Sequence, residues 1–395
     1  MSLPKKSAQL RMTTNVSTEP RIPFNRASLA GNELRYVSEA VSNGHISGGG
    51  AFTRTAEGLL ESISGSQRVL LTTSCTHALE MSARLLDLGP GDEVIVPAYT
   101  FVSTAAAFAL TGAKPVFVDV TQETLNLDVR LAEAAITPRT RAICTVHYGG
   151  IAQGIDELTA LCEERGLALV EDNAHGLGAS FDGRLLGTFG DLSTLSFHET
   201  KNVTCGEGGA LGINRAELVE RAEILREKGT DRSRFLRGQV DKYTWVDVGS
   251  SWVASDMLAA FLVGQLEQFD EIQARRMLVW DEYQSGLASW ARNQNVRTPV
   301  VPPEAKHVAH MYYLRMPSPS ARDRFIAHMD AHGILAVFHY QGLHISDMGR
   351  RFGGVPGQCP VAEQAAETLV RLPLFSDLKN AETDRVIEAV TSFRV

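Results

Sequence analysis

The chain has 395 residues with a formal net charge of -8, and 44% of its residues are hydrophobic and 21% are charged. This composition is ordinary for a globular protein, and the length allows a large core divided between two domains. The negative charge excludes a global basic surface that would attract nucleic acid or a membrane, and no apolar run reaches the roughly 18 residues of a membrane span.

The N-terminal segment is polar, carries Lys5, Lys6 and Arg11, and lacks the roughly 7–15-residue apolar stretch of a secretory signal. We predict that residues 1–20 form a flexible extension, and a regulatory tail is the alternative. The cysteines are odd in number, widely spaced and without a CxxC pair; they are Cys75, Cys144, Cys162, Cys205 and Cys359. They favour a cytoplasmic protein over a disulfide framework, and they do not indicate a metal site.

Short apolar runs alternate with segments of helical spacing through the first two thirds of the chain. The predicted buried strands are residues 69–71, 93–96, 115–120, 142–146 and 167–170, and the helical segments between them include 79–86 and 155–165. Strands of nearly continuous Val, Ile and Leu are typical of a parallel sheet that is covered on both faces. The alternation predicts a doubly wound α/β domain with a mainly parallel sheet.

The rest of the chain shows a different order of predicted helices and strands. Residues 215–228 predict an amphipathic helix that ends at Gly229, and residues 256–286 predict another helix. After about residue 300 the pattern predicts a strand at 310–316, a helix at 322–332 and a strand at 334–340. We therefore predict a large α/β domain at residues 21–275 and a smaller α+β domain at residues 276–395.

Lys201 and Asp172 carry the strongest functional signal. Lys201 precedes a Gly206-Glu207-Gly208-Gly209 turn, and Asp172 follows the apolar run that ends at Val170. Pyridoxal phosphate (PLP) sites use a lysine amine to hold the aldehyde and an aspartate to pair with the ring nitrogen. Catalysis on an amine or ketone is the leading interpretation, and a surface lysine with a helix-capping aspartate is the alternative.

Other candidate residues follow the ends of the predicted strands, where ligands bind in doubly wound sheets. The first strand runs through Ser74 and Thr76 into a helix, whose N-terminus favours a phosphate, although simple helix capping is the alternative. Phe101 could stack on a pyridine ring, Ser196 could contact the phosphate, and His175 could contact Asp172 or the ring oxygen. As a base, Lys201 would need a pKa below the ordinary value of about 10.4.

These residues resemble a known family. The stretches Glu171-Asp172-Asn173-Ala174-His175, Ser196-Phe197-His198 with Lys201, and Gly206 to Gly209 resemble the DegT/DnrJ family of nucleotide-sugar aminotransferases, and the resemblance covers residues 21–395. It implies a fold type I PLP-dependent transferase. Residues 196–202, 226–230 and 237–245 are most similar to dTDP-4-amino-4,6-dideoxygalactose transaminases.

The resemblance also assigns roles by position. Lys201 would bond the cofactor, Asp172 would pair with the ring nitrogen, and His175 would lie near the ring oxygen. Phe101 would stack on the ring, and the phosphate contacts would be Cys75, Thr76 and Ser196. Many relatives have Gly-Thr in place of Cys75-Thr76, and an Asn that reaches the partner subunit's phosphate in the stretch where this chain has Ser251.

For the substrates, the resemblance implies L-glutamate as amino donor, a dTDP-linked 4-keto-6-deoxy sugar as acceptor, and a homodimer with the site at its interface. A basic patch of Arg232, Arg234, Arg237 and Lys242 could bind the nucleotide diphosphate, or it could be a solvated loop. Possible residues of the sugar pocket are His147, Tyr148, His339 and Tyr340, each of which could instead be a structural polar group.

Three alternatives stay open. The acceptor could be a nucleotide-linked 4-ketopentose of an antibiotic glycoside, because a few atoms of difference give only about 1–3 kcal/mol of discrimination. The chain could be a PLP-dependent sugar dehydratase, although Lys201 counts against this because such relatives typically have His there. It could also be a regulator or scaffold that has kept the fold without the activity.

Overall fold

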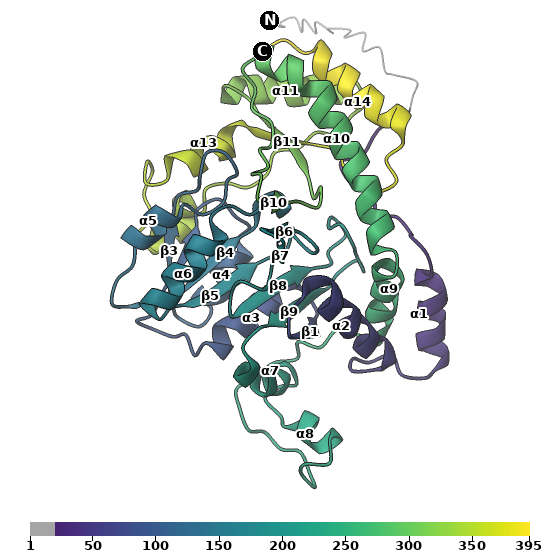
Figure 1. The fold of residues 1–395 in the computed structure, drawn as a ribbon, viewed down its shortest axis with the longest axis vertical. Helices are drawn as coiled ribbons and strands as arrows, with labels where there is room; N and C mark the ends of the chain where they lie inside the picture. Colours follow the sequence, from purple (N-terminus) through teal and green to yellow (C-terminus); the bar gives the residue numbers. More distant parts are fainter. Residues whose placement is uncertain (1–19) are drawn as a thin grey trace, which may run out of the picture.

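The computed structural model describes residues 20–395, so the predicted extension, apart from Pro20, lies outside the described residues. Its centre is a seven-stranded sheet with the order β1-β9-β8-β5-β4-β2-β3 (Figure 1). The strands are β1 (Arg68–Thr72), β2 (Glu93–Pro97), β3 (Lys114–Val118), β4 (Thr140–Val146), β5 (Ala168–Asp172), β8 (Leu192–Ser196) and β9 (Gly209–Ile213). The five strands predicted from apolar runs are all present.

Strand direction brings the ends of distant segments together. β9 is antiparallel to both of its neighbours, β1 and β8, and every other pair in the sheet is parallel. All strands except β9 therefore point the same way, and their carboxyl ends share one edge. β9 begins at that edge, since Gly209 pairs with both Thr72 and Ser196. The predicted mainly parallel α/β fold is confirmed.

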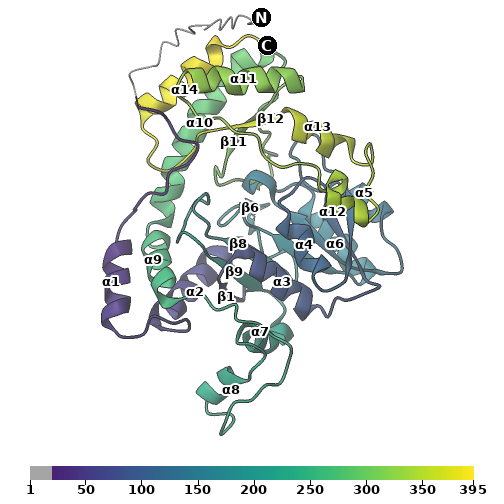
Figure 2. The same ribbon diagram turned by 180° about the vertical axis from the view of Figure 1, so that it is seen from behind.

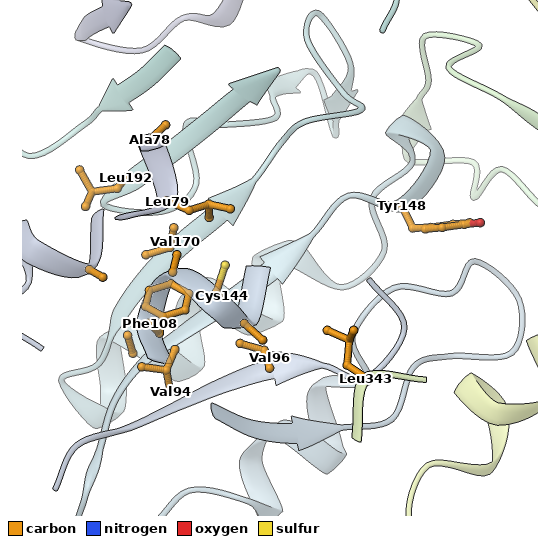
Figure 3. Close-up of a cluster of buried hydrophobic side chains, with 14 of the residues drawn as sticks. Ala78, Leu79, Val94, Val96, Phe108, Cys144, Tyr148, Val170, Leu192 and Leu343 are labelled. Carbon is orange, nitrogen blue, oxygen red and sulfur yellow. The ribbon is translucent and has the colours of Figure 1, made fainter. Parts of the chain in front are cut away.

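Both faces of the sheet are covered by helices, as the doubly wound prediction requires. Along β1, Leu70 packs in one core cluster with α3 (Cys75–Leu85) and α4 (Ser103–Ala109). Val69 and Leu71 point the other way, toward α2 (Ala51–Ser64) and α9 (Asp256–Leu266). Figure 3 shows the first cluster, with side chains of several strands facing those of α3 and α4. The same alternation explains the continuous apolar runs within β1, β2 and β3, whose residues face a covered side in either direction.

A second, smaller unit sits above the carboxyl edge of the sheet (Figures 1 and 2). It contains α10 (Phe269–Asn293), α11 (Pro319–Ala331), α14 (Asn380–Ser392) and the antiparallel pair β11 (Tyr312–Arg315) and β12 (Leu369–Leu372). Its core includes Tyr283, Leu287 and Phe325, and also Ile22 from the other end of the described chain. The predicted boundary between residues 275 and 276 falls within α10, and the division into two domains stays a prediction.

The remaining elements complete the layers and edges. They are α1 (Glu33–Ser42), α5 (Val129–Ala134), α6 (Ile155–Arg165), β6 (Ser180–Phe181), β7 (Arg184–Leu185), α7 (Val219–Arg226), α8 (Arg232–Leu236), β10 (Ala305–Lys306), α12 (Asp347–Arg351) and α13 (Pro360–Thr368). The helix predicted for residues 155–165 is found with those bounds. Over residues 20–395, none of the helices combines the length and apolarity needed to traverse a bilayer.

Three predicted elements need correction. Residues 256–286 do not form one helix, because α9 ends at Leu266 and α10 begins at Phe269, with no Gly or Pro between them to signal the break. Residues 334–340 do not form a strand, since only Ile334 and Val337 make isolated bridges before the chain turns toward the sheet edge. The helix predicted for residues 215–228 is shorter: a 3-10 turn at Ala216–Leu218 precedes α7.

Candidate active site

A cavity of about 830 Å³ lies between the carboxyl edge of the main sheet and the smaller unit. The sheet side contributes Ser74, Asp172 and Lys201, and the smaller unit contributes Tyr340 and Arg371. A volume of this size is in the range that proteins use for cofactors and small molecules. The topology thus gathers into one cavity residues that are far apart in the sequence.

Lys201 lies in the turn that follows β8, where its backbone N–H donates to the carbonyl of His198 at 2.9 Å. Within residues 20–395, the side-chain amine has neither a hydrogen-bond acceptor nor an ion-pair partner. Burial lowers the pKa of Lys201 to about 8, against the opposing effects of Cys75 and Asp172 and with help from the charge of Arg371. An appreciable fraction of the amine is therefore neutral near neutral pH, as a nucleophile or base requires.

The lowered pKa of Lys201 predicts a pH-dependent stability difference in cofactor-free protein. Below pH 8 the folded state must hold the buried ammonium, so Lys201→Met should stabilise it by about 2–3 kcal/mol at pH 7. From about pH 8 toward the ordinary lysine value near 10.4, only the unfolded wild-type chain is protonated, and the difference should disappear. Urea unfolding of both proteins at a series of pH values measures this difference in the free energy of unfolding. A difference that grows with pH would contradict the assignment of the effect to the Lys201 ammonium.

Asp172 ends β5 and is buried. Its Oδ2 accepts a hydrogen bond from the hydroxyl of Thr104 at 2.7 Å, and its Oδ1 accepts one from the N–H of Ala174 at 3.3 Å. Burial raises the pKa of Asp172, while the hydrogen bond from Thr104 and the charge of Lys201 oppose the rise. No cation of residues 20–395 forms a direct ion pair with this carboxylate, so a cationic group in the cavity would complete it.

The N-terminus of α3 opens onto the same cavity. Ser74 caps the helix by accepting from the N–H of His77 at 3.2 Å, and the hydroxyl of Thr76 bonds that of Ser103 at 2.7 Å. The N–H groups of Cys75 and Thr76 have no partner within the helix, which is the usual anion-binding arrangement. A side chain at Gly209 would lie 2.2 Å from the Cys75 nitrogen, so glycine lets β9 pass close beneath this turn. Ser196, at the end of β8, lines the cavity too.

His175 contacts the predicted site residue Tyr340 and two residues that the sequence did not identify, His310 and Gly149. Its ring stacks on that of His310, with 4.1 Å between centroids and 16° between planes. Its Nδ1 accepts from the N–H of Gly149 at 3.3 Å, and its Nε2 lies 3.4 Å from the hydroxyl of Tyr340. Burial and the nearby charge of Lys201 keep the pKa of His175 well below its ordinary value. The ring is therefore neutral.

A chain of contacts links this stack to the lysine turn. His310 Nδ1 lies 2.9 Å from the side-chain oxygen of Asn202, the residue next to Lys201. The buried guanidinium of Arg276 donates to the carbonyls of Ala309 and His310 at 3.2 and 2.7 Å, and Ala309 has a φ of 47°. The only sequence signal for this arrangement was an arginine on the apolar side of a helix.

An aromatic wall closes the side of the cavity toward the smaller unit. Phe101 is 54% exposed and lies against Tyr340, which stacks on His339 with 3.5 Å between ring centroids. The hydroxyl of Tyr148 bonds His339 Nδ1 at 2.7 Å. His339, Tyr340 and Phe101 line the cavity. Tyr148 does not, and instead supports His339 from behind.

Besides Tyr148, three predicted site residues are not brought to the cavity of this chain, namely His147, Arg237 and Ser251. His147 is buried and its Nε2 lies 2.7 Å from Oε2 of Glu171, within the scaffold. Arg237 pairs with Glu223 of α7 at 2.6 Å, and Arg234 and Arg232 of the same basic patch pair with Glu220 and Glu227. Ser251 is exposed and lies outside the cavity walls.

The structure also adds cavity residues that the sequence reasoning missed. Phe24 and Asn25 pass over the cavity, and Asn25 donates to the carbonyl of Glu199 at 2.8 Å. Arg371 of β12 enters from the smaller unit. A charged residue in the otherwise apolar run Leu369-Val370-Arg371-Leu372 was the available signal for it.

Taken together, the chemical groups of the cavity fit a phosphorylated pyridine aldehyde. The unpartnered amine of Lys201 suits an aldehyde, the buried carboxylate of Asp172 suits a protonated ring nitrogen, and the N-terminus of α3 suits a phosphate. Over residues 20–395, no group of three or more His, Cys, Asp or Glu side chains could hold a metal ion.

Known proteins are similar to this chain in sequence and fold along most of their length. The spore coat polysaccharide biosynthesis protein SpsC of Bacillus subtilis (strain 168) is 31% identical over 377 residues, covering 93% of this chain and 96% of SpsC. The structure of DesV from S. venezuelae has a TM-score of 0.86 at 33% identity, covering 94% of this chain and 98% of DesV.

Spr1654 from Streptococcus pneumoniae, assigned as a sugar aminotransferase, has been solved in PLP and PMP forms. Its PLP form has a TM-score of 0.87 at 27% identity, covering 94% of this chain and 98% of Spr1654. These likenesses confirm the fold type I architecture that the resemblance implied. The model of the DegT/DnrJ/EryC1/StrS aminotransferase family matches residues 27–391. The chain therefore belongs to the DegT/DnrJ/EryC1/StrS aminotransferase family.

Proposed function

We propose that this protein is a PLP-dependent aminotransferase that moves an amino group from L-glutamate to C4 of a nucleotide-linked 4-ketosugar, with dTDP-4-keto-6-deoxyhexose as the preferred acceptor. The observation that carries the proposal is the unpartnered amine of Lys201, with a pKa lowered to about 8, in one cavity with the buried carboxylate of Asp172. The relatives named for polysaccharide biosynthesis and sugar amination support the substrate class. Location in the cytoplasm stays a prediction.

The residues around the cavity divide the binding of the cofactor among them. Lys201 would bond its aldehyde carbon, and Asp172, fixed by Thr104 and the N–H of Ala174, would pair with its ring nitrogen. The phosphate is assigned to the α3 N-terminus and neighbouring hydroxyls, namely Ser74, Cys75, Thr76 and Ser196. When bound, PLP supplies an electron sink for the carbon next to the substrate nitrogen.

The side chains of the cavity would also control the transfer of the proton on the reacting substrate carbon. The unbonded amine of Lys201 would be partly neutral near neutral pH, because its pKa is lowered to about 8, and in that form it could take a proton from the substrate carbon. Phe101 lines the cavity and would stack on the pyridine ring, and neutral His175 would present a hydrogen-bonding edge to the ring oxygen. In the second half of the reaction Lys201 returns the proton in the opposite sense, toward the sugar C4.

We further propose a homodimer that buries an apolar arm. Residues 230–250, which include α8, project from the body of the molecule (Figures 1 and 2). Several of their large apolar side chains are exposed, namely Phe235, Leu236, Tyr243, Trp245, Val246 and Val248. Such a patch is typical of a protein interface. In this arrangement Ser251 and the basic patch would reach the partner's cavity rather than their own.

Trp245→Asp should convert this dimer to a monomer at micromolar concentration, because Trp245 is 73% exposed in the single chain and an interface tryptophan is commonly worth at least about 2 kcal/mol. Light scattering after size-exclusion chromatography measures the mass. Val300→Asp, a change at an exposed residue away from the arm, is the matched control and should not alter the mass. An unchanged mass for the Trp245 variant would refute this role of the arm.

The reaction itself is tested by product analysis. Purified protein with PLP, ¹⁵N-labelled L-glutamate and dTDP-4-keto-6-deoxyglucose should yield a sugar carrying ¹⁵N at C4 and one equivalent of 2-oxoglutarate. NMR of the product reads both the site and the stereochemistry. A nucleotide-linked 4-ketopentose in a parallel reaction compares the second acceptor class. Loss of a sugar hydroxyl without 2-oxoglutarate would establish a dehydratase instead, and no change with either sugar would favour a non-enzymatic role.

A further inference from the structure

Arg371 has a fixed place in the cavity wall. It lies on β12, which is paired with β11 on one side, and its backbone also exchanges two hydrogen bonds with Val337 at 3.1 and 2.7 Å on the other (Figure 2). The guanidinium lies over the ring of Phe24, 4.5 Å from the centroid, and one Nη donates to the carbonyl of Phe338 at 3.0 Å. Backbone and side chain are thus both positioned before any ligand arrives.

The guanidinium is nevertheless incompletely satisfied. Its Nε is buried without a hydrogen-bond partner, and no carboxylate of residues 20–395 lies within ion-pair distance of it. Burial lowers the pKa of Arg371 from its ordinary value. By contrast, the buried guanidinium of Arg226 forms an ion pair with the carboxylate of Glu57, with 2.5 Å between Nη1 and Oε1. A partly buried cation without a counterion is costly, and an anionic ligand in the cavity would supply the missing negative charge.

The charge of Arg371 acts close to the reacting group. It contributes to the lowered pKa of Lys201, and also to those of His175 and His339. Asp172, the buried carboxylate of the same cavity, already faces Lys201. Arg371 and Lys201 also line the same cavity, so an anion bound there by Arg371 would share the cavity with the amine of Lys201, where the substrate nitrogen reacts.

This position selects between the two anionic substrates. In an α-amino acid, the carboxylate is separated from the amine by a single carbon, so it stays beside the reacting nitrogen. In a sugar nucleotide, the sugar ring separates the diphosphate from C4. The planar carboxylate also matches a guanidinium in a bidentate manner. We propose that Arg371 binds the α-carboxylate of the amino donor, and of the keto acid that leaves; this rests on the proposed transaminase function.

Binding of 2-oxoglutarate to the PLP-loaded enzyme tests the inference without turnover, because this ligand has the carboxylates but no amine. Calorimetry should show that Arg371→Gln binds 2-oxoglutarate on the order of 100-fold more weakly than wild type. Arg371→Lys should bind it about 10-fold more weakly, because lysine keeps the charge but lacks the paired N–H donors of a guanidinium. Affinity for thymidine diphosphate should stay within about twofold. Arg324→Gln, at an arginine of α11 outside the cavity walls, is the matched control and should bind both ligands like wild type.

The first half-reaction gives a second readout. With glutamate alone, the cofactor absorbance should change more slowly in Arg371→Gln, because this variant binds glutamate weakly. The glutamate concentration that gives the half-maximal rate should therefore rise. Equal 2-oxoglutarate affinity in wild type and in either folded Arg371 variant would overturn the inference. Weaker binding of thymidine diphosphate in place of 2-oxoglutarate would also overturn it, by assigning Arg371 to the nucleotide. Neither result depends on which sugar is aminated, so failure of the acceptor assignment would be seen separately.

Discussion

Replacing Lys201 by alanine is expected to lower kcat by at least about 10³-fold, since one side chain both bonds the cofactor and moves the proton. Among the described residues 20–395, the two histidines nearest to this point, His175 and His310, are poor substitutes as a base. His175 and His310 stack with their pKa values well below the ordinary histidine value, and each already has a hydrogen-bonding partner. Steady-state production of 2-oxoglutarate from glutamate and the ketosugar measures the loss.

Two further measurements separate the roles of Lys201. Borohydride reduction of the wild-type holoenzyme, followed by peptide mapping, should place the cofactor on Lys201. Adding a small primary amine such as methylamine should restore part of the activity of Lys201→Ala, because it can supply the missing base. Lys228→Ala, at an exposed lysine beside Glu227, is the matched control and should keep wild-type activity. Unchanged turnover in Lys201→Ala, or a label on another lysine, would end the assignment.

Asp172→Asn should lower kcat by roughly 10²–10³-fold, in the range seen when a single electrostatic contact to the reacting group is removed. The amide has the size of the carboxylate and can still accept from Thr104, so the fold should survive. What disappears is the negative charge, which keeps the ring nitrogen protonated and the ring able to take electrons.

The control for this change is a surface aspartate. Asp156→Asn, in the exposed first turn of α6, should leave turnover unchanged. Circular dichroism and the retained cofactor absorbance would show that the Asp172 variant is folded and loaded. If the folded, cofactor-loaded Asp172→Asn protein has a kcat comparable to wild type, the ring nitrogen does not need this carboxylate. That result would remove one of the two residues on which the proposed chemistry depends.

The sequence predicted the main sheet where apolar residues were continuous, and missed it where they were not. β8 and β9 are rich in Ser, Thr and Gly, so their local pattern does not stand out from a loop. Their composition is explained by packing: a side chain at Gly212 would lie 2.3 Å from the hydroxyl of Ser193 on the neighbouring strand. Small residues are required there by contacts that no local pattern records.

The same limit applies to the site. Cavity residues that directly follow β1, β5 and β8 could be identified, because parallel strands bring their carboxyl ends to one edge. His147 follows β4 in the same way, yet its side chain turns into the scaffold to meet Glu171. Tyr148 supports His339 rather than facing the cavity, a pairing across 191 positions of sequence.

The sequence by itself determined the α/β architecture and the family, and it predicted Lys201 and Asp172 as the central site residues, because strand periodicity and strand-end chemistry are local properties of the chain. Only the tertiary structure decided which polar side chains reach the cavity. It placed Arg371 in the same cavity as Lys201, with no ion-pair partner among residues 20–395, and it set the Arg276 carbonyl contacts that hold His310 against His175. These arrangements depend on how the smaller unit packs over the sheet edge, and that packing joins residues with no shared local pattern.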